Sequence, residues 1–136
     1  MSYGVSAALQ SAVYQAMVAD PDISALVGSH IFDALPSGTL PDTYISLGPE
    51  IVQDRSDMTG VGADHSFTIS VVSVVSGFAS TKVVAGAVCD LLHQADLTLD
   101  RGALVSMNFK RATAKRVGAG DTRRIDLRFV ARVEDD

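Results

Sequence analysis

The stretch TRRIDLRFVARV, residues 122–133, decides how the rest of this 136-residue chain folds. Ile125, Leu127 and Phe129 alternate in it with Asp126 and Arg128, and Ala131 and Val133 continue the same apolar face. A period of two puts the apolar side chains on one face of a β-strand and the charged ones on the other. The sequence therefore predicts a C-terminal strand with one buried face and one cationic face.

The segment before this strand is expected to pair with it in a hairpin. Val105, Met107 and Phe109 share one face of a second strand. A three-residue loop at 118–120, with Gly120 supplying a positive φ, would place Phe109 opposite Phe129. On the outer face, this register pairs Lys110 with Arg128, Ala114 with Arg124, and Ser106 with Arg132.

Charge is distributed unevenly along the chain, whose net charge is −5. Residues 103–136 carry eight bases and five acids, a balance of +3, whereas residues 1–102 carry three bases and eleven acids, a balance of −8. Complementary ends favour association of copies through two different patches. Either solvent or an acidic protein surface can cover the cationic face, and we favour the protein surface. The expected interface residues are Lys110, Arg116, Arg124, Arg128 and Arg132.

Two main helices are expected from the apolar spacing. The first runs from about Val5 and stops at Asp20-Pro21, and a short turn over 23–27, capped by Asp22, follows it. The second helix begins at Ser80, as its N-cap, and its apolar stripe includes Val84, Val88 and Leu92.

Further strands are expected at 43–47, closed by Gly48-Pro49, and at 65–72. Between them, residues 50–63 show almost no periodicity and predict a long mobile loop. The order helix, strand, strand, helix, strand, strand predicts a single α+β domain over residues 1–136. We expect an antiparallel sheet of about four strands, with both main helices packed on one face.

No pattern in the sequence points to catalysis, a cofactor or a metal. His30, His65 and His93 do not form a pair at ligand spacing, and His65 is expected to pack or hydrogen-bond inside. Cys89 is expected to be a buried, inert thiol. No apolar run approaches the length of a membrane span, and no signal peptide is evident at the start of the chain.

The order of these segments resembles the tail-completion, or tail-terminator, proteins of long-tailed phages and phage-like gene transfer agents. The resemblance covers nearly the whole chain and depends on the spacing of several weak motifs together. Those motifs are Asp20-Pro21, the runs 23–28 and 44–48, His65 opening a strand, Leu91-Leu92-His93, and the basic strand beginning with Thr122-Arg123-Arg124.

This resemblance implies a structural protein that forms a ring, expected to be a hexamer, at the head-proximal end of a tail tube. Such a ring ends tube polymerisation and contacts both the tube protein and the head connector. DNA passes through its lumen without specific binding. The loop at 50–63 would then dock on the tube, through Asp54, Arg55, Asp57 and Met58.

Three rival functions are consistent with the same sequence. A connector or stopper on the head side, or a tail-tube subunit, would share the structural character. A nucleic-acid-binding module would instead use the basic hairpin against phosphates, usually with aromatic residues among the bases. In the expected register, Phe109 and Phe129 lie on the other face, which weakens this alternative.

Overall fold

Four long strands and one short strand form a single sheet in the computed structural model, which describes residues 3–58, 60–118 and 121–135. The strands are β1 (Ile31–Phe32), β2 (Thr43–Asp54), β3 (Val61–Ser73), β4 (Ala103–Val117) and β5 (Thr122–Asp135), arranged in the order β1-β2-β3-β5-β4. The long strands pair antiparallel, and β1 pairs parallel with β2. The predicted α+β class is confirmed, with one more strand than expected.

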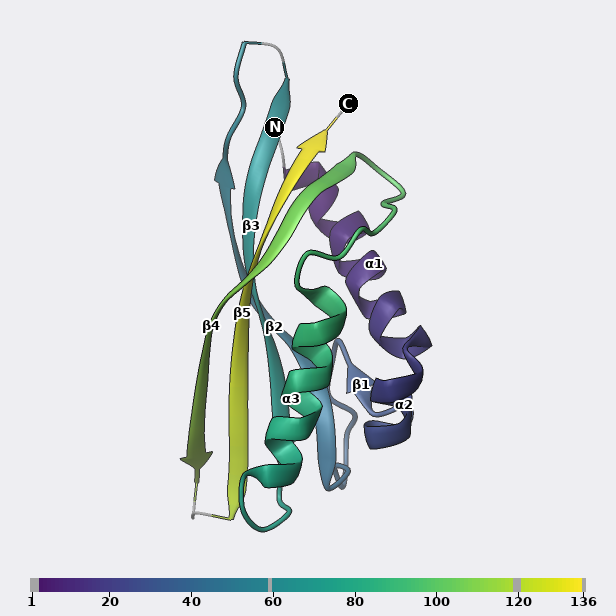
Figure 1. The fold of residues 1–136 in the computed structure, drawn as a ribbon, viewed down its shortest axis with the longest axis vertical. Helices are drawn as coiled ribbons and strands as arrows, with labels where there is room; N and C mark the ends of the chain where they lie inside the picture. The colour runs from purple at the N-terminus through teal and green to yellow at the C-terminus, as the bar shows by residue number, and fades with distance from the viewer. Residues whose placement is uncertain (1–2, 59, 119–120, 136) are drawn as a thin grey trace.

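Three α-helices, α1 (Ser6–Ala19), α2 (Pro21–Val27) and α3 (Ala79–Leu92), lie on one side of the sheet (Figure 1). A single 3₁₀ turn, η1 (Tyr3–Val5), precedes α1. The opposite face of the sheet has no helix over it in the described residues. None of the described helices is both long and apolar enough to span a membrane.

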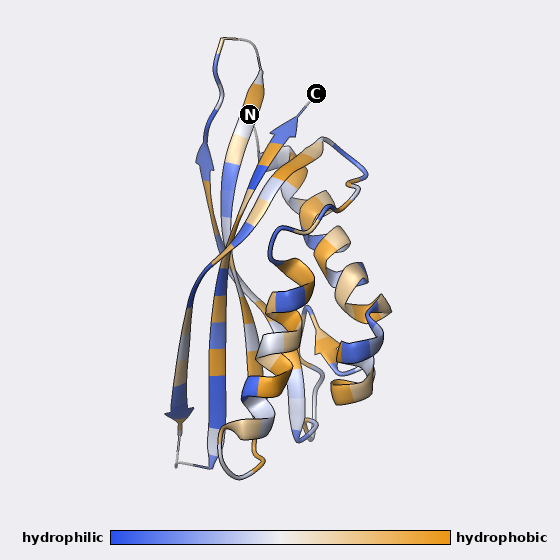
Figure 2. Ribbon diagram, in the orientation of Figure 1, coloured by the Kyte–Doolittle hydropathy of each residue, from blue (hydrophilic) through white to orange (hydrophobic). Residues whose placement is uncertain are grey.

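The core lies between the helices and the odd-numbered side chains of β5. Phe129 is fully buried and lies between Phe67 of β3 and Phe109 of β4, with ring centroids 5.7 and 5.9 Å away. From the helices, Leu9 and Val88 pack into the same cluster. The alternation along β5 is visible in Figure 2 as bands of opposite hydropathy. The predicted buried face of the C-terminal strand is therefore confirmed.

The hairpin register is correct in its first half and wrong in its second. Phe109 lies opposite Phe129, and Ser106 lies opposite Arg132, as predicted. A bulge after Phe109 leaves Lys110 without a partner on β5, so Arg111 lies opposite Arg128. Ala114 consequently faces Ile125 rather than Arg124, because the extra residue shifts every later pair by one.

The shift continues into the turn of the hairpin. Val117 pairs with Thr122, so four residues rather than three connect the strands. Gly118 has a positive φ of 65°. The positive φ predicted at Gly120 falls outside the described residues. A second bulge, after Leu104, leaves Val105 exposed. Leu104 therefore lies opposite Val133, where the expected register placed Val105.

The sequence suggested that residues 50–63 form a structureless loop, but strands occupy much of this segment. β2 continues through Gly48-Pro49 to Asp54, and β3 already begins at Val61. A register shift between Leu47 and Glu50 accommodates the proline, which has no N–H to donate. Pairing with β3 supplies the hydrogen bonds that the weak local pattern did not predict.

The helix boundaries differ slightly from the expected ones. Asp20, rather than Asp22, caps α2: its Oδ2 accepts a hydrogen bond of 3.0 Å from the backbone N–H of Ile23. Ser80 lies inside α3, whose N-cap residue is Phe78, and makes no capping hydrogen bond there. Both differences are shifts of two residues at helix ends, where the apolar spacing gives no signal.

Candidate functional site

The open face of the β4–β5 hairpin gathers cationic side chains, and we call it the cationic face. It consists of Arg124, Arg128 and Arg132 on β5 and Arg111 and Lys115 on β4. These residues alternate with side chains that point toward the helices, and the cross-strand pairs Arg111–Arg128 and Lys115–Arg124 place them in two rows. Like charges directly opposite each other repel by a few tenths of a kcal/mol. The face is therefore a surface that an anionic partner would stabilise.

Asp126 partly neutralises the cations at one end of the cationic face. Its Oδ1 accepts hydrogen bonds from the Ser70 hydroxyl (2.6 Å) and from Arg124 Nε (2.8 Å), and Lys115 Nζ lies 3.9 Å from Oδ2. Arg124 Nη2 also donates to Ser70 Oγ at 3.1 Å. Partial burial alone would raise the pKa of Asp126. The bonds from Ser70 and Arg124, with the charges of Arg124 and Lys115, outweigh that and hold the pKa below its ordinary value.

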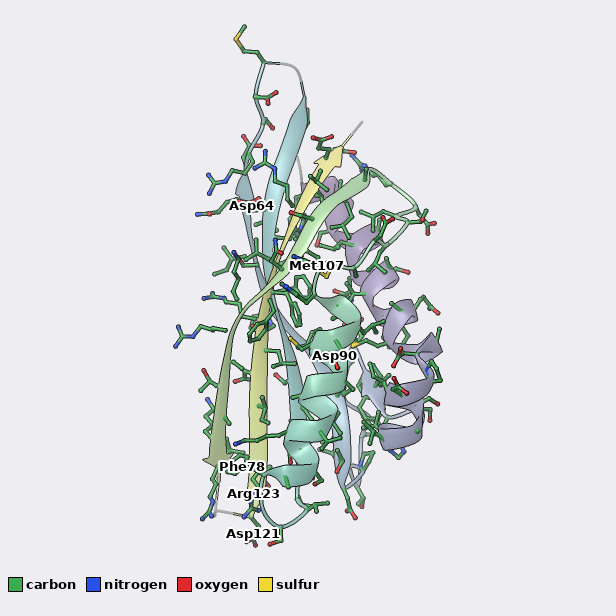
Figure 3. All side chains as sticks on the ribbon, in the orientation of Figure 1. Asp64, Phe78, Asp90, Met107, Asp121 and Arg123 are labelled. Carbon is green, nitrogen blue, oxygen red and sulfur yellow. The ribbon has the colours of Figure 1, made fainter. Side chains whose placement is uncertain are left out.

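Asp64 on β3 balances the other end of the cationic face. Its Oδ2 accepts a hydrogen bond from Arg55 Nε at 2.8 Å, and Arg132 Nη1 lies 3.9 Å from its Oδ1. Figure 3 places Asp64 toward one end of the long axis and Arg123 at the other. Between these two acids, Arg128 and Arg111 form no ion pair with a carboxylate of the described residues, and both side chains are exposed.

The five residues predicted as an interface do not all share this face. Arg124, Arg128 and Arg132 lie on it as expected, and Lys110 sits in the bulge at the sheet edge. Arg116 lies opposite Arg123 and, because of the bulge, points to the helix side. Sequence reasoning missed Arg111 and Lys115, which take the outward positions. The bulge at Lys110 turns Arg111 and Lys115 outward and Arg116 toward the helices. No pattern in the sequence marks the position of this bulge.

Arg123 belongs to a separate cluster at the turn end of the hairpin. Its side chain is mostly buried, its Nη1 donates to the Asp121 carbonyl at 3.1 Å, and its guanidinium carbon lies 5.8 Å from the centre of the Phe78 ring. Lys82 Nζ lies at the same distance from that ring. Figure 3 shows Phe78, Asp121 and Arg123 together at this end of the molecule. Phe78 thus stabilises two cations through its π face.

The residues predicted to dock on a tail tube lie at the tip of the β2–β3 hairpin. Asp54 ends β2, and its Oδ1 accepts a 2.6 Å hydrogen bond from the Ser56 hydroxyl. The backbone N–H of Arg55 donates to Gly62 and that of Asp57 to Gly60, so the hairpin stays closed nearly to its end. Met58 is completely exposed. The hairpin tip extends past the ends of the neighbouring strands (Figure 1).

The one buried histidine takes part in a structural network. His65 is fully buried, and its Nδ1 lies 3.1 Å from Glu50 Oε2. The Ser6 hydroxyl donates to both oxygens of Glu50, at 2.8 and 3.0 Å. The prediction that His65 hydrogen-bonds inside the protein is confirmed, and the network ties the start of α1 to β2 and β3.

Neither the cysteine nor the acids assemble a reactive centre in the described residues. Cys89 is partly buried, and burial together with the nearby Asp90 raises the pKa of its thiol, so the reactive thiolate is disfavoured. Across residues 3–58, 60–118 and 121–135, no three histidine, cysteine or acidic side chains cluster as metal ligands would.

The helices cover one face of the sheet and leave the charged face open to solvent or to a partner. Residues 11–134 match the family model of the tail completion protein gp17, so the chain belongs to that family, as the resemblance predicted. A chain in the solved structure of the virion of a native gene transfer agent (GTA) particle is 56% identical to it. The alignment covers 98% of this chain and 99% of that one, with a TM-score of 0.93. No curated protein matches the chain.

Family membership places this protein among the structural components of phage-like tails rather than among enzymes, in agreement with the sequence analysis.

Proposed function

We propose that this protein forms a ring, with six subunits, at the head-proximal end of the tail of a gene transfer agent particle. The ring ends polymerisation of the tail tube and joins the tail to the head connector, while DNA passes through its lumen without specific binding. The observation that carries this proposal is the near-complete likeness to a chain of a gene transfer agent virion, combined with membership of a tail completion family.

The cationic face supports an interface role. Arg128 and Arg111 lie side by side without a carboxylate partner among the described residues, an arrangement that an acidic protein surface would stabilise. The interface comprises Arg124, Arg128 and Arg132 on this face. It also includes two residues of β4, Lys110 at the sheet edge and Arg116 on the helix side. A neighbouring subunit or the head connector supplies the acids.

The tip of the β2–β3 hairpin supports contact with the tube. It projects along the long axis of the molecule and presents Asp54, Arg55, Asp57 and the exposed Met58. An exposed apolar side chain at such a tip can enter a hydrophobic pocket of a partner. We propose that these four residues dock on the last ring of tube subunits.

Electron cryomicroscopy of particles that carry an epitope-tagged copy tests the location. We expect density for the protein at the junction of head and tail, and a particle whose junction lacks it would eliminate the proposal. Purified protein that polymerises into long tubes would favour a tail-tube subunit instead. A protein located on the head side of the junction would favour a connector or stopper.

A charge-reversal pair tests the interface. Arg124→Glu combined with Arg128→Glu should leave the subunit folded and reduce the yield of joined particles. The matched control is Asp90→Arg with Asp96→Arg, which reverses two exposed charges away from the cationic face and should leave the yield unchanged. Equal yields from both double variants would remove the cationic face from the proposal.

The geometry disfavours the nucleic-acid-binding alternative. Phe109 and Phe129 point to the helix side, so the outward arginines are not interleaved with aromatic rings that could stack on bases. Filter binding of DNA at low and at moderate salt checks this directly. We expect no retention at moderate salt.

A further inference from the structure

The two halves of β4 differ in how their outer edge is covered. In the first half, the carbonyl of Met107 accepts a 2.6 Å bond from the N–H of Gln94, and the N–H of Phe109 donates to His93 Nδ1 at 3.0 Å. The segment after α3 therefore covers this part of the edge. From Lys110 to Arg116 every side chain is exposed, and β5 is the strand that pairs with this half.

The open half of β4, residues 110–117, is strongly cationic, and we call it the basic edge. Its four cations are Lys110, Arg111, Lys115 and Arg116, and it contains no acid. The bulge sends Arg111 and Lys115 to one face and Arg116 to the other, so positive charge flanks the strand on both sides. Lysine and bulges on an edge strand prevent pairing with an identical edge. The basic edge is therefore suited to an unlike, acidic surface.

The opposite side of the molecule provides such a surface, which we call the acidic edge. It comprises Asp20 and Asp22 at the start of α2, and Asp33 and Asp42 on either side of the β1–β2 connection. Residues 1–54 contain six acids and no base. Asp33 also lines an open groove of about 660 Å³ that runs along η1 and α1, from Tyr3 to Tyr14.

The positions of the two edges suit repeated side-by-side contact. β1 and β4 are the two terminal strands of the sheet. In Figure 1, the end of β4 lies on one side of the molecule, and α2 and β1 lie on the other side at a similar level along the long axis. Figure 2 shows both the end of β4 and the start of α2 as hydrophilic. A copy placed beside the first without inversion would bring basic edge to acidic edge, which is a heterologous contact.

We propose that the basic edge of one copy docks on the acidic edge of a second copy of this chain. This contact deepens the proposed function, on which it rests, by naming the surfaces that join neighbouring subunits. Because the two surfaces differ, each subunit uses both of them. Such contacts close into a ring where the rotation between subunits permits it.

Two charge-reversed variants test this pairing by sedimentation velocity of the purified full chain. The basic-edge variant is Arg111→Glu with Arg116→Glu, and the acidic-edge variant is Asp33→Lys with Asp42→Lys. In each variant alone, the altered edge carries two charges of each sign and no net charge, so the attraction between the two edges is lost and self-association should weaken at least about tenfold, equivalent to 1.4 kcal/mol. An equimolar mixture should associate again, because the unchanged acidic edge of the first variant then meets the unchanged basic edge of the second. Circular dichroism of each variant checks folding.

Three outcomes would overturn the inference. They are wild-type protein that stays monomeric at every salt and protein concentration, single variants that associate like the wild type, and a mixture that fails to associate. Wild-type association that weakens with added salt supports it, because salt screens exposed charges. If the two edges do not bind each other, the proposed location at the head–tail junction still stands and is tested separately by electron cryomicroscopy. Absence from the junction, with the mixture still associating, would instead reject the proposed function and keep the contact.

Discussion

Arg111 lies directly opposite Arg128 across the β4–β5 ladder, on the face of the sheet that no described helix covers. The pair exists because Lys110 occupies a bulge and moves every later residue of β4 by one position. A folded subunit gains nothing from two opposed guanidinium groups, since they repel each other. The proposed interface would bring an anionic partner to this pair, and the repulsion within it gives the first prediction.

Arg111→Glu should stabilise the isolated subunit, because it replaces a repulsive cross-strand pair by an attractive one. The expected gain is about 0.2–1 kcal/mol in the free energy of unfolding. Urea unfolding of the variant and the wild type at low salt measures it. Arg111→Gln removes the repulsion without adding an attraction, so its free energy of unfolding should lie between those of the wild type and Arg111→Glu. A destabilised Arg111→Glu subunit would show that the two side chains do not face each other.

Phe129→Ala should destabilise the subunit strongly, because the ring is fully buried between Phe67 and Phe109. Loss of a buried phenylalanine side chain costs about 3–5 kcal/mol. Val105→Ala is the matched control, since this residue is exposed at a bulge and should change stability by less than about 0.5 kcal/mol. Thermal melting followed by circular dichroism checks both, and similar melting temperatures would contradict the register.

Gly102→Ala should destabilise the protein more than an alanine at an ordinary left-handed glycine. Gly102 has a φ of +71°, and a Cβ there would collide with the backbone carbonyl of Glu134. Together, the left-handed conformation and the overlap should cost about 2–5 kcal/mol. Gly77→Ala has the matching φ of +77° but open space around it, so it should lose only about 1–2 kcal/mol. Equal losses in urea unfolding would mean that the close approach to Glu134 is not rigid.

Glu50→Ala should destabilise the start of α1 and the strands beneath it. The substitution leaves fully buried His65 Nδ1 and the Ser6 hydroxyl without their shared acceptor. An unsatisfied buried polar group costs about 1–3 kcal/mol. Equilibrium unfolding measures the loss, with Asp33→Ala as the control because Asp33 is an exposed acid. A loss no greater than that of the control would show that the network contributes nothing.

Asp126 should make stability depend on pH in the acidic range. Its pKa is lower in the folded protein than the ordinary carboxyl value of 3.8. The folded state therefore favours the charged form, and the resulting stability is present above the ordinary pKa and is lost as the pH falls through the lowered one. The difference in unfolding free energy between the wild type and Asp126→Asn should shrink below about pH 4. A difference that stays constant from pH 7 to pH 3 would contradict this linkage.

The sequence by itself determined the buried face of β5, the first helix as far as Asp20, and the concentration of cations near the carboxyl end. Each of these follows from a period of two or 3.6 residues or from a count, which are properties of a continuous segment. Only the tertiary structure decided the bulge at Lys110, the continuation of β2 through Pro49, and the bond between Ser70 and Asp126, which are 56 residues apart. These depend on which distant segment satisfies a backbone or side-chain hydrogen bond at the lowest cost. Local periodicity carries no information about that competition, so Arg111 and Lys115 became visible as surface residues only in the folded hairpin.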